Sequence, residues 1–467
     1  MRKIYWYITI YIKKHGLVVF LSVLGAIAVF SIVLPILLSK FAFKPKKYIG
    51  LIGDYTLMTL PLEVKRTLSV GLTEVNSQKE VKPLLAERWI VEDEGKRYRF
   101  ILRKDVTWQD GQAIKPEDIK YQFNDVETIT TPNDVIFKLP DVFSPFPSVV
   151  SEPVFRQGIM KKWGLFKVPT LIGIGDYEIV DYKRNGNRIN EITIDSPKEK
   201  LIYRFYLTEN EAVAAFKKGE IDVLPNLTAP HDIINWQTVE VTPKLNNDLY
   251  LAVFFNNSSP LLPKNVRQAL SYAVEKPADA TRAIGPINPD SWAFLQGGKT
   301  YDKDLTRAIE RLLDDVPSQP LNLDLTTTSE FAADAEAMRK QWLELGEKAA
   351  AACQGEKKVE DKALCQNLKI QINIKVTNFP DTTNFQLLLV GQETPADPDQ
   401  YFLWHSERTT NFTNYKNTRI DSLLEKGRKT LEQNERQAIY QEFQQFLLED
   451  PPAIFLRHLY SYEVRRG

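Results

Sequence analysis

The segment Ala396–Ser406 (ADPDQYFLWHS) brings together side chains that could do chemistry. Asp397 and Asp399 are two carboxylates separated by a proline, and His405 follows in the same segment. An acid–base pair of carboxylates needs opposed pKa values, and on that hypothesis the chain is a surface-tethered hydrolase of peptide or cell-wall material. The alternative is a turn in which one acid faces a ligand. The second interpretation favours a binding protein, and we expect no enzyme.

Other signatures of catalysis or of cofactor binding are missing from the sequence. It has four histidines but no His-Glu-x-x-His, Gly-x-Ser-x-Gly or paired Cys-x-x-Cys motif. QGGKT at Gln296–Thr300 is only a fragment of a phosphate loop, because Ala293 stands where its first glycine would fall. The 60 basic and 60 acidic residues balance, which argues against the positive field that nucleic-acid binding requires. We expect no cofactor, no metal and no nucleic-acid partner.

The N-terminus differs in composition from the rest. Residues 1–15 are basic and aromatic, and 16–39 form an uncharged apolar run. At about 1.5 Å per residue such a helix can cross a hydrocarbon core of roughly 30 Å. We therefore expect an uncleaved transmembrane signal anchor, a single pass through the cell membrane. Lysines flank both ends of the run, so charge alone does not fix its orientation.

Two cysteines, Cys353 and Cys365, bracket a short polar segment without histidine, which argues against zinc. The sequence leaves two alternatives for these cysteines, a local disulfide or two unrelated free thiols. A pair confined to one short loop favours the disulfide and an oxidising compartment.

The remaining chain alternates short strands with helices, which predicts an α/β fold. Asn185-Gly186 predicts a hairpin turn, and Leu321–Val376 reads as a β-α-β unit. In Phe100–Phe123 (FILRKDVTWQDGQAIKPEDIKYQF), Trp108 is expected to pack over a corner, and Pro116 to open a helix with an apolar stripe. A single long helix is expected from about 420 to 449.

Six blocks in order resemble one known family. They include PLLAERWIVEDEGKRYRFILRKDVTWQDGQAIKPEDIKYQF (83–123), GIGDYEI (173–179), FKKGEIDVL (216–224), LPKNVRQALSYAVEK (262–276), ADPDQYFLWHS (396–406) and PPAIFLRHLYSYEV (451–464). The chain resembles the extracytoplasmic solute-binding proteins of ABC transporters, in the family with oligopeptide-, dipeptide- and nickel-binding members.

The resemblance implies a two-lobed clamshell like the periplasmic binding proteins of class II, with an extra subdomain. One lobe would comprise 45–80, 170–250 and 450–467, the accessory subdomain 81–169, and the second lobe 251–449. The expected function is the membrane-anchored, extracytoplasmic subunit of an ABC importer, which binds a peptide or similar elongated solute and works with permease and ATPase subunits. A sensor or chaperone on the same fold is an alternative.

The resemblance also implies which residues contact the ligand. Phe255 and Asn256 are expected where the chain crosses between lobes. In peptide binders of this family a Gly-Trp and an aspartate before the Asp-Pro-Asp block help to hold the peptide amine, whereas here Gln392 replaces the tryptophan and the nearest acid is Glu393. The candidate ligand-binding residues are Phe255, Asn256, Trp292, Glu393, Asp397, Asp399, Tyr401, Trp404 and His405.

Overall fold

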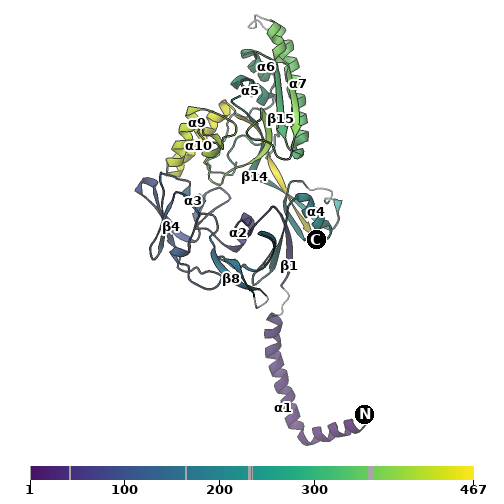
Figure 1. The fold of residues 1–467 in the computed structure, drawn as a ribbon. Coiled ribbons are helices and arrows are strands. Elements are labelled where there is room, and N and C mark those ends of the chain that lie inside the picture. Colours follow the sequence, from purple (N-terminus) through teal and green to yellow (C-terminus); the bar gives the residue numbers. More distant parts are fainter. Residues whose placement is uncertain (1, 41–43, 163–165, 230–232, 234, 356–361) are drawn as a thin grey trace.

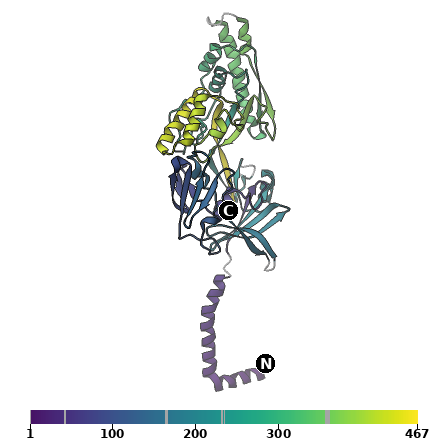
Figure 2. The ribbon, with the colours of Figure 1, turned by 60° about the vertical axis from the view of Figure 1, so that its left-hand side comes forward.

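The computed structural model describes the chain except for residues 1, 41–43, 163–165, 230–232, 234 and 356–361. An N-terminal helix, α1 (Arg2–Lys40), lies apart from the folded body in both ribbon views (Figures 1 and 2). It bends at His15, whose backbone is not helical. The window Lys13–Ser31 has a mean hydropathy of 1.8 and is 0% buried. By length and composition this helix can cross a membrane, in agreement with the predicted apolar segment.

The body is organised around one ten-stranded mixed sheet in the order β10-β11-β12-β1-β13-β18-β14-β17-β15-β16. Its strands are β1 (Lys46–Ile52), β10 (Glu178–Asn185), β11 (Arg188–Asp195), β12 (Lys200–Tyr206), β13 (Val223–Leu227), β14 (Val239–Phe255), β15 (Leu321–Thr327), β16 (Ile370–Val376), β17 (Leu387–Glu393) and β18 (Ala453–Arg466). Strands β14 and β18 are long, pair antiparallel and run through both halves of the sheet. The sheet therefore forms two lobes joined by these two strands.

The crossing between the lobes lies where the β14–β18 register is interrupted, between Asn246 and Tyr250. The predicted crossing at Phe255–Asn256 is wrong. Residues 250–255 are fully buried in the second lobe, because this run is apolar on both faces of the strand, whereas the polar first half of β14 belongs to the first lobe. The expected boundaries at residues 250 and 450 accordingly fall in or beside strands that serve both lobes.

The first lobe carries α2 (Leu62–Leu68) and α4 (Glu209–Lys217) on its sheet. The predicted Asn-Gly hairpin is present as β10–β11, with Gly186 at a φ of 61°. A second hairpin, β8 (Arg156–Lys162) with β9 (Phe166–Ile172), packs on the core of this lobe, although all but its last three residues lie within the expected accessory range 81–169.

A separate four-stranded sheet has the order β4-β5-β7-β6. Its elements are β4 (Ala86–Glu92), β5 (Arg97–Leu102), β6 (Glu127–Thr130) and β7 (Asp134–Lys138), with the small hairpin β2 (Thr73–Val75)–β3 (Val81–Pro83) and helix α3 (Phe146–Val149) beside it. Most of the buried apolar residues of 72–154 share one core, and we call this range the small-sheet unit.

Trp108 packs into that core as expected, with 1% of its surface exposed. The predicted helix after it is wrong, since the described residues 116–126 contain only a 3₁₀ turn, Pro116–Asp118. The Asp118 carboxylate accepts hydrogen bonds from the Trp108 indole at 3.2 Å and from the Lys115 N–H at 3.1 Å. The chain then continues extended from Ile119. The apolar spacing thus identified buried residues but not a helix.

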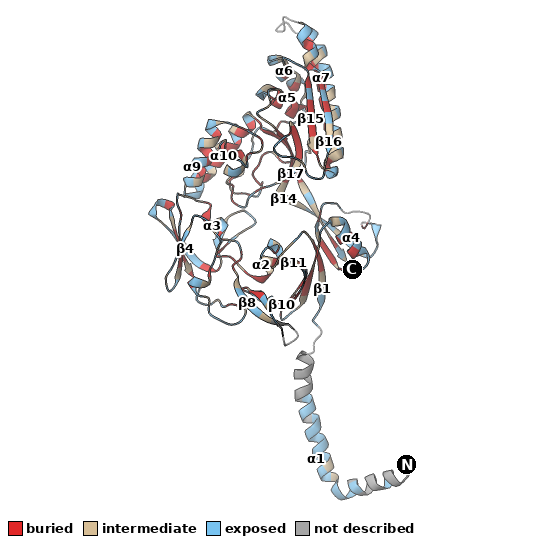
Figure 3. Cartoon of the chain, viewed as in Figure 1, coloured by how far each residue is buried: buried red, intermediate tan, exposed pale blue. Residues whose placement is uncertain are grey.

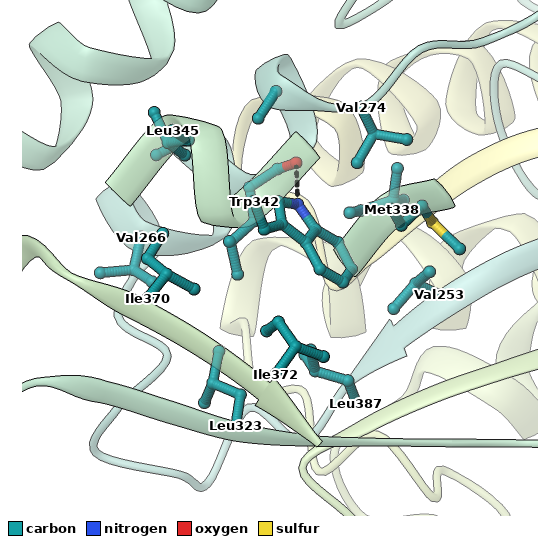
Figure 4. Packing of buried hydrophobic residues seen from close by; sticks show 14 of the residues in the cluster. Val253, Val266, Val274, Leu323, Met338, Trp342, Leu345, Ile370, Ile372 and Leu387 are labelled. Atoms are coloured by element: carbon teal, nitrogen blue, oxygen red, sulfur yellow. Dashed lines mark hydrogen bonds between the residues drawn. The ribbon is translucent and has the colours of Figure 1, made fainter. Parts of the chain in front are cut away.

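Helices cover both faces of the second-lobe sheet (Figure 1). One face carries α5 (Lys264–Ala273), α6 (Leu305–Asp314) and α7 (Ala332–Gly355), and the other α8 (Tyr401–Trp404), α9 (Thr418–Lys429) and α10 (Gln433–Glu449). The parallel pairing of β15 with β16 confirms the β-α-β unit. Trp342 of α7 is buried among aliphatic side chains, and its indole N–H donates to the Leu270 carbonyl at 2.9 Å (Figure 4).

The expected single helix from 420 to 449 is two helices, because Thr430 adopts an extended conformation. Gly427 permits α9 and α10 to pack closely, since an added Cβ would lie 2.8 Å from the Tyr440 ring. At the far end of the lobe, Cys353 and Cys365 form a disulfide that joins α7 to the 3₁₀ segment Lys362–Leu368. Of the two alternatives for the cysteines, a disulfide or two free thiols, the structure therefore contains the disulfide. Burial is concentrated along the sheets and the inner helix faces (Figure 3).

Candidate ligand-binding site

The Asp-Pro-Asp block forms a buried electrostatic anchor for the loop after β17. Asp397 accepts two hydrogen bonds from Arg436 of α10, at 2.6 Å and 3.1 Å. Both side chains are less than a tenth exposed. Asp397 Oδ1 also accepts the N–H of Asp399 at 3.0 Å. In contrast to the expected ligand contact, Asp397 holds this loop on α10.

Asp399 is held in a similar way. Its Oδ2 lies 3.0 Å from Arg428 Nε, and its Oδ1 accepts the Tyr401 N–H at 3.1 Å, which positions the start of α8. Burial raises the pKa of Asp399 to about 6; Arg428 opposes this shift, and the charge of Asp397 adds to it. With arginine partners on both carboxylates, the geometry of an acid–base pair is not present.

Three other candidates are buried in the second lobe, and a fourth, Asn256, is half-buried there. Trp404 is 0% exposed and packs 6.2 Å from the Phe254 ring. His405 is also buried, with its Nε2 3.2 Å from Glu425 Oε1. Phe255 is a core residue, and the Asn256 amide donates to the Phe385 carbonyl at 2.9 Å. The expectation of direct ligand contact is not supported for these four side chains, because hydrophobic packing and internal hydrogen bonds occupy them.

Trp292 contributes to a junction between distant parts of the chain. Its indole N–H donates to the Lys79 carbonyl at 3.2 Å, and Lys79 Nζ lies 2.5 Å from Asp248 Oδ1. Asp248 belongs to the crossing segment of β14, and its Oδ1 also accepts from the Asn288 amide at 2.6 Å. Trp292 therefore ties the second lobe to the β2–β3 turn, and it lines neither of the cavities described next.

Two cavities lie beside the loop that follows β17. The larger, of about 730 Å³, is lined by residues 122–126, 139–143, Phe146 and Val149 of the small-sheet unit and by Tyr401, Phe402, Arg408, Glu425, Arg428 and Lys429 of the second lobe. The smaller, of about 440 Å³, is lined by residues 392–396, Asp399, Gln400, Phe402 and Leu403. Phe402, 55% exposed, lines both.

The structure thus places three of the candidates at these cavities. Tyr401 lines the larger cavity, and Glu393 and Asp399 line the smaller one. Arg408 and Arg428 also line the larger cavity, although neither is among the candidates expected from the sequence. Both stack on Tyr401, at 4.6 Å and 4.2 Å from its ring centre, a cation–π arrangement that only the fold brings together.

The small-sheet unit contacts α9 next to the larger cavity. The Ser144 N–H donates to the Arg428 carbonyl at 2.7 Å, and the Ser144 hydroxyl donates to the Gly427 carbonyl at 3.2 Å. Lys429 Nζ lies 3.1 Å from Asp141 Oδ2. Helix ends leave such carbonyls without helical partners. These contacts, which we call the clasp, lie beside the larger cavity, which Asp141, Arg428 and Lys429 also line.

Two lobes joined by a pair of crossing strands, with aromatic-lined cavities beside one lobe, define a solute-binding protein. The chain belongs to the bacterial extracellular solute-binding proteins, family 5, whose middle-region model matches residues 80–414. This is a family of binding proteins rather than enzymes, and the predicted resemblance is confirmed.

Curated relatives and solved structures agree with this assignment. The chain is 23% identical to the dipeptide-binding protein of Escherichia coli (strain K12), over 83% of this chain and 82% of that protein. It is 23% identical to the oligopeptide-binding protein AppA of Bacillus subtilis (strain 168), over 89% and 87%.

The fold is similar to that of the substrate-binding protein CtaP of Listeria monocytogenes, with a TM-score of 0.69 and 19% identity over 91% of this chain and 94% of that one. It is also similar to NikZ of Campylobacter jejuni in complex with Ni(L-His), with a TM-score of 0.66 and 21% identity over 91% and 94%. The expected two-lobed fold is confirmed.

Proposed function

We propose that this protein is the membrane-anchored, extracytoplasmic substrate-binding subunit of an ABC importer, and that it binds an oligopeptide or a similar elongated solute and delivers it unchanged to a permease. The observation that carries the proposal is the pair of cavities that meet at Phe402. The larger has the volume of a small-molecule site, which is roughly 300–1,000 Å³, and the two together favour an elongated ligand. The relatives named for dipeptides and oligopeptides support the same class.

The clasp and the crossing strands suggest how a ligand would enter. The lobes are joined by β14 and β18, and the small-sheet unit touches α9 through Ser144 and Asp141. A hinge motion at the register interruption would separate the clasp and expose the larger cavity, which the small-sheet unit and the second lobe line together. A ligand that contacts both walls of the larger cavity would favour the clasped form, because it gains these contacts only there.

The helix α1 supplies the proposed anchor. A tether keeps a binding subunit close to its permease and ATPase partners at high effective concentration. The disulfide Cys353–Cys365 suits an oxidising compartment outside the cytoplasm. Protease added to intact spheroplasts should digest the body and spare α1. A body that stays intact until the membrane is lysed would contradict the extracytoplasmic placement.

Calorimetric titration of the full chain in detergent micelles with tripeptides to pentapeptides tests the binding function. We expect saturable binding at micromolar or lower concentration, and recovery of the peptide intact after long incubation. A sample that unfolds cooperatively on heating yet binds none of these peptides would refute a peptide ligand, and cleaved peptide would refute simple binding.

A further inference from the structure

A bend separates the first part of α1 from the part that can cross a membrane. The uncharged run 16–39 is long enough on its own to cross a hydrocarbon core of roughly 30 Å, at about 1.5 Å per residue. His15, with a φ of −127° and a ψ of 23°, interrupts the helix just before this run. In both ribbon views the part before His15 turns aside from the rest of α1 (Figures 1 and 2). Residues 2–14, which we call the leading segment, are therefore not needed for the crossing.

The leading segment has the residue pattern of a helix that lies at a membrane surface. Ile4, Ile8 and Ile12 recur at intervals of four, so the helix places these positions along one face, and Tyr11 falls beside them. Four basic positions fall on the opposite side of the helix, namely Arg2, Lys3, Lys13 and Lys14. Trp6 and Tyr11 are both more than half exposed, and such rings gather at membrane–water interfaces. This combination is typical of helices that lie in the headgroup plane.

The basic residues of the leading segment have no acidic partner on their own side of the membrane-crossing run. The sequence contains no Asp or Glu before Asp54, which lies beyond that run in the body. Arg2 and Lys3 therefore stand in a first helical turn without an acid, at the helix end that already bears a partial positive charge. Their counter-ions have to come from outside the chain, and the phosphate groups of anionic lipids supply such a layer of negative charge.

We propose that the leading segment binds anionic phospholipid, with its apolar face toward the acyl chains and its four basic residues on lipid phosphates. With the body outside the cell, these lipids belong to the inner leaflet. The inference rests on the proposed anchor and goes beyond it, because the bend at His15 then fixes the depth of the membrane-crossing helix at its inner end. It does not depend on which solute the body binds.

Hydrogen exchange of the full chain in lipid nanodiscs, measured by mass spectrometry, tests the recognition of lipid charge. The probes are discs of phosphatidylcholine alone and discs of phosphatidylcholine with phosphatidylglycerol. The amides of the leading segment should exchange more slowly in the anionic discs. Lys13→Gln/Lys14→Gln should make this exchange about five- to thirtyfold faster, at roughly fivefold per charge near an anionic surface. The same variant should leave the rate in neutral discs unchanged.

Lys46→Gln/Lys47→Gln is the matched control, because it removes the same charge beyond the outer end of the membrane-crossing run. It should leave the exchange of the leading segment unchanged in both kinds of disc. Exchange that is equally slow in neutral and anionic discs would refute recognition of lipid charge. Fast exchange in both, with protection only in native membrane vesicles, would assign the leading segment to a protein partner and refute lipid binding.

Spin labels on opposite sides of the leading segment test its orientation. Cys353 and Cys365 are joined in a disulfide, so Ile8→Cys or Ile10→Cys introduces a single labelling site. The label at position 8, on the apolar face, should be reached by oxygen dissolved in the acyl chains. The label at position 10, on the basic side, should be reached by a water-soluble nickel chelate.

Equal access of the chelate to both labels would refute the surface orientation, since a segment that projects into water exposes both positions. A chain that elutes apart from the discs would overturn the proposed anchor itself. A chain that enters the discs but whose leading segment exchanges fast in both lipids would overturn only the lipid binding, so the two failures are distinguishable.

Discussion

Lys79 and Asp248 join the small-sheet unit to the strand that crosses between the lobes, with 2.5 Å between Nζ and Oδ1. Lys79 sits in the β2–β3 turn at a φ of 61°, and its carbonyl accepts from Trp292 of the second lobe. One residue of this turn thus contacts both the crossing strand and the far lobe. The pair is placed to set the relative orientation of the lobes.

Lys79→Met should loosen this junction. We expect a loss of about 1 kcal/mol in the free energy of unfolding, because Asp248 keeps the Asn288 hydrogen bond and is partly exposed. The radius of gyration without ligand should rise, as measured by small-angle X-ray scattering. Lys82→Met, which removes a half-exposed pair with Glu80, is the control and should change neither quantity. Equal scattering from both variants would contradict a role for Lys79 in lobe orientation.

Breaking the buried pair of Asp397 and Arg436 should lower the free energy of unfolding by more than Lys79→Met does. Arg436→Met leaves the Asp397 carboxylate buried without its partner, and breaking such a pair typically destabilises a protein by about 3–5 kcal/mol. Denaturant unfolding followed by circular dichroism measures the change. The double variant Arg436→Met/Asp397→Leu should recover much of the loss, since neither member of the pair then leaves a buried charge without its partner. A single variant as stable as the unmodified chain would show that the pair is dispensable.

Asp399 predicts a pH dependence. Its folded-state pKa of about 6 lies above the ordinary value of 3.8, so the folded chain holds this proton more tightly than the unfolded chain. The contribution of Asp399 to stability is therefore fully present below about pH 4 and is lost as the pH rises through 6, by up to about 3 kcal/mol. The Asp399→Asn side chain does not titrate in this pH range, so the variant lacks this pH-dependent contribution to stability.

Unfolding curves of the two proteins at pH 4 and pH 7 check this. The free energy of unfolding of the variant, minus that of the unmodified chain, should be higher at pH 7 than at pH 4. A difference between the proteins that does not vary with pH would contradict the raised pKa. Asp176→Asn, at an exposed carboxylate in another loop, controls for the general effect of acid.

The fold was predictable because its signals are local or ordered along the chain. Alternating and helical periodicities identified the hairpin at Gly186 and the β-α-β unit, and the ordered blocks identified the family. The helix expected after Pro116 is only the 3₁₀ turn Pro116–Asp118, because the chain is extended from Ile119 onward. The apolar residues Ile119, Phe123 and Val126 pack into the core of the small-sheet unit, so their spacing marks burial and not a helix.

The candidate site was predictable only in its location. The loop after β17 lines the smaller cavity, and Tyr401 and Phe402 of α8 line the larger one, but the sequence does not show that Arg436 and Arg428 bind the two aspartates. Those partners lie on helices beyond the loop, so only the fold shows which charges are already neutralised. The sequence likewise does not show that Arg408 stacks on Tyr401, because only the fold brings the two side chains together.

The clasp predicts a measurable coupling between the exposed ion pair Lys429–Asp141 and the half-buried backbone amide of Ser144. Lys429→Glu places two acids opposite each other at Asp141, which should favour separation of the small-sheet unit from α9. The Ser144 amide, which donates to the Arg428 carbonyl, then loses protection. Its hydrogen exchange should become about two- to fivefold faster, the range for an exposed pair. Lys426→Glu makes the same charge change on α9 but lies outside the cavity lining, and should leave that exchange rate unchanged. Equal rates in all three proteins would mean that the ion pair does not hold the clasp closed.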